Sequence, residues 1–262
     1  MQSFAAGAIP ETHYRVAADA SLGNLVAEFG PSRKQTVGFV VAMVLFGLAT
    51  AGAIAGATQI DWDDSDDVAG IVAALAICGG LTLLFSLAYW LNRTLRVQLY
   101  DAGFAWSRRN KLISMRWTDV TSCTARVTRT YVNGVYTGTQ HVYVLRDGRA
   151  QKIRLGNSLH DIETLGPRVE DQVFRAQIGP AMQSYQAGGS VAFGPYTVSR
   201  IGISNGKGML RWEEVARAEV ARGWVRIHKV GKRWPWLSSA CGSMPNLRVF
   251  LALVSQRVRI DG

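Results

Sequence analysis

The pattern of apolar and polar positions divides this chain into two unlike parts. Two long runs without a charged side chain, residues 35–60 and 68–92, come first, and neither has a polar face at helical spacing. Each run is longer than the roughly 20 residues that a helix needs to cross a hydrocarbon core. The pattern therefore predicts a hairpin of two transmembrane helices, joined by the acidic segment 61–67.

Basic residues flank the two runs at one end of the predicted hairpin. Arg33 and Lys34 precede the first run, Arg93 and Arg96 follow the second, and segment 61–67 holds neither lysine nor arginine. Cytoplasmic flanks carry the excess of lysine and arginine in membrane proteins. We therefore expect a multi-pass protein of the plasma membrane, with both termini in the cytoplasm and the acidic segment outside the cell.

Residues 1–34 are expected to form a cytoplasmic N-terminal segment. Their mixed polarity, with Glu11, Asp19 and Glu28 among them, does not match the apolar core of a cleavable signal peptide. The first helix is then expected to be an uncleaved anchor.

Small residues recur four positions apart in both predicted helices. They are Gly52 and Gly56 in the first helix, and Gly70 and Ala74 in the second. Such residues let helix backbones approach closely in lipid. Because a short loop makes the two helices antiparallel neighbours, the spacing predicts packing within the hairpin, with dimerisation between chains as the alternative.

Beyond residue 92 the pattern changes to the alternation that is typical of strands. Residues 127–132 alternate and lead to Asn133-Gly134, the strongest short signal for a β-hairpin. After Gly156 the apolar positions recur at helical spacing, and we expect Gly166-Pro167 and Gly179-Pro180 to interrupt this helix. The pattern predicts several antiparallel strands followed by helix.

The same order of elements returns after residue 188. Gly103-Phe104 corresponds to Gly202-Ile203, and residues 115–120 correspond to residues 210–215, with a shared W-x-[DE]-V element. Local sequence that repeats in the same place within two segments indicates an internal duplication.

A strand-rich unit that ends in an amphipathic helix resembles the pleckstrin-homology-like fold. At the C-terminus such a helix is predicted from Leu247 onward, with Phe250 and Leu251 on its apolar face. The resemblance implies two such units, residues 93–188 and 189–262. The expected fold class is a transmembrane helical hairpin with an α+β cytoplasmic part.

The whole chain resembles a bacterial family of membrane proteins of unknown function. The likeness lies in residues 22–29, 193–200, 211–215 and 245–254. These segments are turns, core aromatic residues and a helix start, so the resemblance implies an architecture and no activity.

Positive charge is concentrated after the second apolar run. From Arg93 onward the chain has 26 lysines and arginines against 11 acidic residues, a net charge of +15. A basic domain beside a bilayer is expected to bind anionic lipid headgroups, with a membrane protein or a second copy of the chain as the alternative partner. Nucleic acid is disfavoured, since no recognition motif is present.

Cys78, Cys123 and Cys241 are far apart, as in proteins of a reducing compartment.

Two clusters combine basic and aromatic side chains, the combination that favours a membrane interface. The candidate residues for binding lipid or a partner are Arg108, Arg109 and Lys111 in the first cluster, and Lys229, Lys232, Arg233, Trp234 and Trp236 in the second. The competing interpretation is that the tryptophans belong to a core and that the charges are solvated.

The sequence favours no catalytic, metal or cofactor site. Residues 202–206 match G-x-S-x-G, but a strand follows where a nucleophile elbow needs a helix, so a hydrolase is only a distant alternative. Gly206-Lys207 lacks the serine or threonine of a phosphate loop. The four histidines are scattered, and the acidic segment lacks the glycine and distal glutamate of a calcium loop.

We therefore predict a non-enzymatic membrane-anchored protein that presents basic domains at the inner leaflet. These domains would bind anionic lipid or a membrane protein. A structural assembly factor, or scaffold, of a membrane complex is the alternative function.

The orientation of the hairpin can be tested by chemical labelling in intact cells. We expect a cysteine introduced by Ser65→Cys to react with a membrane-impermeant thiol reagent, because it lies outside. Cys241 should stay protected until the cells are permeabilised. Labelling of Cys241 alone in intact cells would contradict the predicted orientation.

Overall fold

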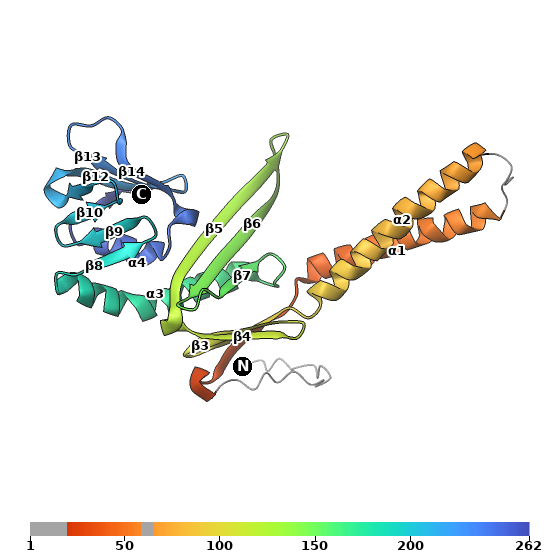
Figure 1. Cartoon of the computed structure of the whole chain (residues 1–262), viewed down its shortest axis with the longest axis horizontal. Helices are drawn as coiled ribbons and strands as arrows, with labels where there is room; N and C mark the ends of the chain where they lie inside the picture. Colours follow the sequence, from red (N-terminus) through yellow and green to blue (C-terminus); the bar gives the residue numbers. More distant parts are fainter. Residues whose placement is uncertain (1–19, 59–64, 262) are drawn as a thin grey trace, which may run out of the picture.

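The computed structural model describes residues 20–58 and 65–261 and has three parts (Figure 1). A long helical hairpin projects from one end of the molecule. A first unit of two sheets lies at its base, and a second unit of two sheets lies farther from the hairpin.

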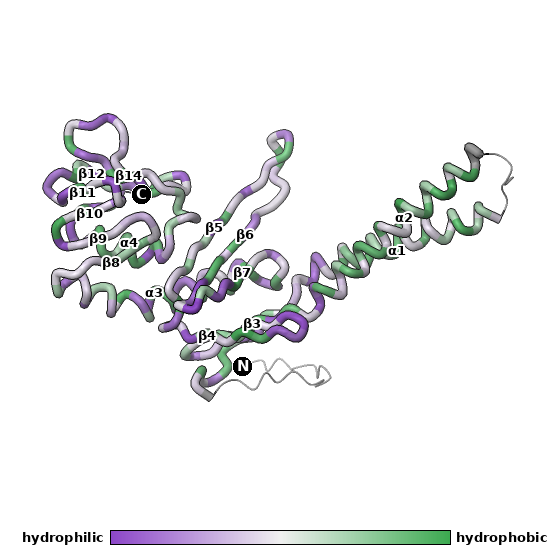
Figure 2. Tube along the Cα trace, viewed as in Figure 1, coloured by the Kyte–Doolittle hydropathy of each residue, from purple (hydrophilic) through white to green (hydrophobic). Residues whose placement is uncertain are grey.

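The hairpin consists of α1 (Arg33–Ala57) and α2 (Ser65–Asn92). Both helices are long and apolar enough to cross a membrane, and hydrophobic residues occupy most of their length (Figure 2). Residues 59–64 of the expected acidic loop lie outside the described residues, and Ser65–Asp67 form the first turn of α2 rather than part of a loop. The rings of Phe46 and Phe85 stack between the helices with centroids 5.7 Å apart.

The small residues of the hairpin do not all face the partner helix. A Cβ atom at Gly56 would lie 3.9 Å from Cδ1 of Ile71, so this glycine contacts α2. Ala74 is half-buried, whereas Gly52 and Gly70 are exposed, with open space around the position of a Cβ. Packing within the hairpin therefore uses one of the two predicted positions in each helix.

The hairpin is inserted into the first sheet. Strand β1 (Leu25–Phe29) precedes α1 and pairs antiparallel with β2 (Arg96–Tyr100), which follows α2. The sheet continues with β3 (Gly103–Arg108) and β4 (Lys111–Arg116), in the order β1-β2-β3-β4. The segment before the hairpin, expected to be separate from the domains, thus supplies an edge strand whose partner is about 70 residues away.

The first unit is completed by a second sheet and a long helix. The turn η2 (Trp117–Asp119) leads to the antiparallel strands β5 (Val120–Val132), β6 (Val135–Asp147) and β7 (Lys152–Gly156). The predicted hairpin at Asn133-Gly134 is present, and both residues have the positive φ that this turn requires. The helix α3 (Ile162–Gln186) follows.

Helix α3 is continuous, so the predicted interruptions at its two prolines are wrong. Pro167 and Pro180 both lie inside the helix and are exposed. A proline removes one backbone hydrogen bond, and on an exposed face water can satisfy the carbonyl that is left free. Gly166 is required for a different reason, since a Cβ there would overlap the ring of Tyr143.

The two halves of α3 belong to different cores. Leu165, Val169 and Val173 are buried in the core of the first unit. Farther along the helix, Ile178 and Tyr185 pack in the core of the second unit. Because one rigid helix supplies both cores, it joins the two units.

The second unit repeats the element order of the first without a helical insertion. Its first sheet contains β8 (Ser190–Phe193), β9 (Tyr196–Ser199), β10 (Gly202–Ser204) and β11 (Met209–Arg211), followed by the turn η3 (Trp212–Glu214). Its second sheet contains β12 (Val215–Ala221), β13 (Trp224–Lys229) and β14 (Pro235–Ala240), with β15 (Ile260–Asp261) added in parallel to β12. The turn η4 (Cys241–Ser243) leads to the short helix α4 (Leu247–Val254), which packs its apolar face into the core.

The two repeated tryptophans occupy matching places. The indole Nε1 of Trp117 donates to the carbonyl of Tyr100, at the end of the second strand of its sheet. The indole Nε1 of Trp212 donates to the carbonyl of Ser199, at the same place in the other unit. Both are buried and begin the corresponding turns η2 and η3, as expected from an internal duplication.

Asn246 fastens the second unit to strand β5 of the first. Its side-chain Oδ1 accepts from the backbone N of Cys123 at 2.7 Å, and its Nδ2 donates to the carbonyl of Thr121 at 2.9 Å. Its own backbone N donates to the carbonyl of Cys123 at 2.8 Å. These bonds provide partners for backbone N–H and carbonyl groups at the outer edge of β5. Asn246 has the left-handed conformation (φ 50°) that asparagine tolerates well.

We expect the substitution Asn246→Ala to destabilise the protein by about 1–3 kcal/mol, since it leaves polar groups of β5 without partners. Thermal unfolding of the purified full chain in detergent would measure this. Asn246→Gly keeps the backbone conformation and should lose nearly as much, because the amide is still missing. Asn110→Ala, at an exposed turn, is the matched control. Equal stability of all three variants would show that Asn246 does not fasten the units.

Candidate functional site

A groove of about 420 Å³ lies at the base of the helical hairpin. Its walls come from the first turn of α1, from β3, β6 and β7 of the first unit, and from the loop after β7. The lining residues are Gln35, Leu95, Trp106, Arg108, Gln140, His141, Val142, Lys152, Ile153, Arg154, Gly156, Asn157 and Ser158. The groove thus lies where the hairpin meets the first unit.

Backbone hydrogen bonds fix the start of α1 against one wall of this groove. The N of Ser32 donates to the carbonyl of Ser158, and the N of His160 donates to the carbonyl of Gly30, both at 2.8 Å. Between them, Pro31 and Leu159 form an antiparallel bridge. The helix end and the loop after β7 therefore have a defined relative position.

Three cationic side chains line the groove, and no lining residue is acidic. Lys152 and Arg154 are two residues apart on β7, so they share its exposed face, while Ile153 and Leu155 point into the core. Arg108 comes from β3 on the other sheet. The site therefore attracts anions.

Three buried nitrogen atoms of groove-lining side chains have no partner among the described residues. Nε1 of Trp106 and both ring nitrogens of His141 are buried and make no hydrogen bond. The closest carboxylate to the histidine is exposed, with Oε1 of Glu163 at 3.7 Å from Nε2, beyond hydrogen-bond distance. Buried polar groups normally have a partner, so these nitrogens are candidates to bind a ligand, and the cationic side chains beside them favour an anion.

Asn157 fixes the backbone that carries His141. Its Oδ1 accepts from the N of His141 and its Nδ2 donates to the carbonyl of Thr139, each at 2.7 Å. This amide continues the ladder of β6 where β7 ends. Lys152, Arg154, His141 and Asn157 were not predicted as site residues. The only local signal was the alternation of basic and apolar residues along β7.

The first predicted cluster lies beside this groove, at the base of the helical hairpin. Arg108 lines the groove, and Arg109 stacks on the ring of Trp90 of α2 with its Cζ 4.5 Å from the centroid. The backbone N of Arg109 also donates to Oγ1 of Thr94. Lys111 is exposed opposite Arg108 in the β3–β4 register, in the hydrophilic turn near the helix base (Figure 2).

The second predicted cluster lies on the second unit, away from the first cluster (Figure 1). Nζ of Lys229 forms an ion pair with Glu214 at 2.8 Å, and Trp236 packs half-buried against the second core. Trp234 is 78 % exposed, and Lys232 and Arg233 beside it are exposed as well. The structure therefore divides the candidate residues into two separate surfaces.

The G-x-S-x-G segment and the other histidines that the structure describes have positions that the fold explains. Ser204 ends β10, and Oδ1 of Asn205 accepts from the backbone N of Lys207 and of Gly208, so G-x-S-x-G is a hairpin turn. His228 is buried with its Nε2 3.7 Å from Glu219. His160 is exposed, and His13 lies outside the described residues. Across residues 20–58 and 65–261 no group of three metal-ligating side chains comes together.

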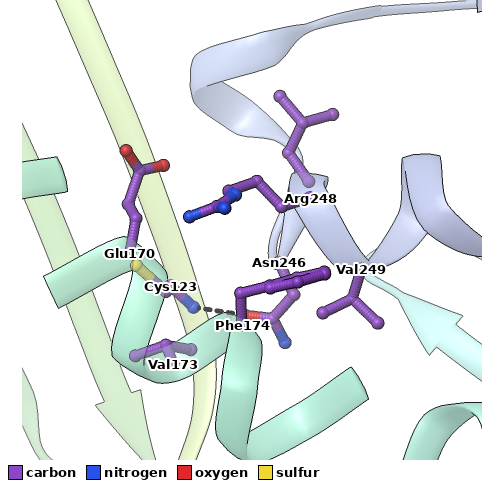
Figure 3. A pocket seen from close by; sticks show the side chains of 8 residues that line it. Cys123, Glu170, Val173, Phe174, Asn246, Arg248 and Val249 are labelled. Carbon is purple, nitrogen blue, oxygen red and sulfur yellow. Dashed lines mark hydrogen bonds between the residues drawn. The ribbon is translucent and has the colours of Figure 1, made fainter. Parts of the chain in front are cut away.

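A small cavity of about 20 Å³ lies at the junction of the two units (Figure 3). Cys123 and Glu170 border it from the first unit, and Arg248 of the second unit extends toward Glu170. Burial raises the pKa of Glu170, and the nearby Arg248 guanidinium lowers it in part. Arg248 also lies over the ring of Phe174 at 4.7 Å and bonds to Asp171. The cavity has room for about one water molecule, so it is part of the packing between the units.

Comparison with known proteins identifies the family. The model of a family of unknown function, DUF6585, matches residues 9–260 of this chain. The chain belongs to the DUF6585 family. Neither the curated proteins nor the solved structures contain a significant match to it. The groove and the exposed surfaces of this DUF6585 protein are therefore the features that bear on its function.

The two cysteines outside the hairpin should differ in reactivity. Burial raises the pKa of the Cys123 thiol to about 12, so at pH 8 only about one molecule in ten thousand carries the reactive thiolate there. Burial raises the pKa of Cys241 as well, but this side chain is half-exposed. We expect iodoacetamide to label Cys241 in the folded chain and Cys123 only after unfolding, as read by peptide mass spectrometry. Equal labelling rates in the folded protein would contradict the packing at the junction.

Proposed function

We propose that this DUF6585 protein is a non-enzymatic membrane protein that binds an anionic lipid headgroup in the groove at the base of its hairpin. In this proposal α1 and α2 cross the plasma membrane, both termini are cytoplasmic, and the two units lie at the inner leaflet.

The element order supports a pleckstrin-homology-like architecture for both units. Each unit has one sheet of four strands, then a sheet built on three consecutive antiparallel strands, and then a C-terminal helix. We propose that the hairpin is an insertion between the first two strands of the first such unit.

The position of the groove is the observation that carries the proposal. It is lined by Gln35 of α1, so a headgroup bound there would be close to the point where the helix enters lipid. Arg108, Lys152 and Arg154 supply positive charge, and Trp106 lines the groove with an indole N–H that has no partner among the described residues. A phosphate group can accept several such charge-assisted hydrogen bonds at once.

A scaffold for a membrane complex is the second candidate function, and two observations favour it. Trp234, Lys232 and Arg233 form an exposed basic and aromatic surface far from the hairpin, where a protein partner could bind. Gly52 and Gly70 are exposed on the hairpin, so a second copy of the chain or another transmembrane helix could pack against them.

The lipid proposal is tested by neutralising the groove in the full chain. Each cation near an anionic surface contributes about 1 kcal/mol, so Arg108→Gln, Lys152→Gln and Arg154→Gln together should weaken phosphatidylglycerol binding by up to about a hundredfold at low salt. The effect should shrink as salt rises, because exposed charges are screened. The measurement is titration of detergent-solubilised protein with short-chain phosphatidylglycerol, followed by native mass spectrometry.

The matched control removes the same charge from the second unit, with Arg222→Gln, Lys232→Gln and Arg233→Gln. We expect this variant to bind phosphatidylglycerol as the unmodified chain does. Glycerol phosphate added in excess should compete for the groove, because the proposed site binds the phosphate of the headgroup. Equal affinity of both triple variants, together with copurification of a stoichiometric protein, would favour the scaffold function instead.

A further inference from the structure

The long hairpin of β5 and β6 extends beyond the sheet to which it belongs. Strand β7 pairs with β6 only over residues 142–146, so from residue 141 to the turn the hairpin is a ribbon of two strands. We call residues 127–140 the β-arm. Figure 1 shows it standing clear of both units.

The end of the β-arm is apolar and uncharged. Between Thr130 and Gly138 there is no acidic or basic residue, and the apolar side chains there are exposed on both strands. The exposed fractions are 57 % for Tyr131, 55 % for Val132, 67 % for Val135 and 54 % for Tyr136. The two tyrosine rings pack edge to face across the ribbon, with centroids 5.8 Å apart.

A ribbon of two strands with both faces in water is at best marginally stable by itself. Exposed apolar residues that cluster in this way mark a contact with a partner or a membrane. The tip therefore requires a covering surface, and its position in the fold shows which surface is available.

The β-arm begins beside the base of the helical hairpin. Gln140 and His141 line the same groove as Gln35, in the first turn of α1. From Gln140 to the turn at Asn133 the chain extends seven residues, or roughly 24 Å at the rise of a β-strand. In Figure 1 the β-arm and the α1–α2 hairpin both lean to the upper right, on the same side of the first unit. A bilayer around the hairpin therefore lies in the direction in which the β-arm points.

We propose that the tip of the β-arm inserts into the interfacial layer of the bilayer that the helical hairpin spans. Tyrosine is favoured in this layer, where its ring is buried and its hydroxyl stays hydrated. Val132 and Val135 would enter the acyl boundary, as the apolar faces of peripheral membrane segments do. The β-arm and the helices then contact one membrane at two separated places, which fixes the tilt of the first unit.

This inference rests on the proposed membrane crossing by α1 and α2, and one experiment tests the two separately. The full chain with Cys78→Ala and Cys241→Ser is labelled with an environment-sensitive fluorophore at a single introduced cysteine. Cys123 is retained, since its buried thiol does not react in the folded protein. The labelled positions are Val135→Cys at the tip, Leu84→Cys on the lipid-facing side of α2, and Lys207→Cys in an exposed turn of the second unit.

The labelled proteins are placed in nanodiscs that contain lipids with a nitroxide near the headgroup end of the acyl chain. We expect several-fold stronger quenching at Val135 and at Leu84 than at Lys207. Quenching at Leu84 but not at Val135 overturns the β-arm proposal and leaves the membrane crossing intact. Absence of quenching at Leu84 overturns the membrane crossing itself.

A charge at the tip provides the matched comparison. With the label at Val132→Cys, the substitution Val135→Asp should abolish most of the quenching, because a carboxylate is disfavoured in the acyl boundary. Thr128→Asp places the same charge on the exposed lower part of the same arm and should leave the quenching unchanged. If both aspartate variants behave alike, the tip does not enter the bilayer.

Discussion

The antiparallel pairing of β1 with β2 is the constraint on which the arrangement of this protein depends. The strand that enters the helical hairpin and the strand that leaves it are direct neighbours, with Phe29 opposite Val97 and Glu28 bonded to Arg96 at 3.0 Å. The start of α1 and the end of α2 therefore lie beside two paired strands of one sheet. A second attachment comes from the N of Ser32, which donates to the loop after β7, and from the carbonyl of Gly30, which accepts from the N of His160. Together they determine which side of the first unit faces the base of the hairpin.

Helix α3 holds the second unit in a defined position relative to the first. Its first half fills the first core and its second half fills the second, so the units cannot reorient without exposing apolar side chains of one helix. Asn246 and Arg248 add polar contacts at the same junction. Under the proposed membrane crossing, attachment at one end of the protein would therefore also position the exposed surface around Trp234 at the other end.

The groove and the β-arm are both consequences of this arrangement. The groove exists because residues of α1, β3, β6 and β7 meet at one corner, and its basic side chains come from different sheets. The β-arm starts from the same corner, because β6 continues past the end of β7. A headgroup site next to an apolar tip would let the first unit contact charge and hydrocarbon in the same leaflet, and the second unit would remain free to meet a partner.

The sequence by itself determined the elements that depend on neighbouring residues. The apolar runs of α1 and α2, the turn at Asn133-Gly134 and the apolar face of α4 can be read from local periodicity, because each is formed by residues a few positions apart. The repeated glycine and tryptophan elements likewise indicated two corresponding units.

Only the tertiary structure decided the contacts between distant segments. Strand β1 has no strong pattern of its own, and its partner lies beyond the whole helical hairpin. Lys152 and Arg154 are candidate site residues because Trp106 and Gln35, from other parts of the chain, line the same groove. Pro167 and Pro180 are tolerated because they fall on the exposed side of a helix that two cores hold in place. Such outcomes follow from packing in three dimensions, which local propensity does not encode.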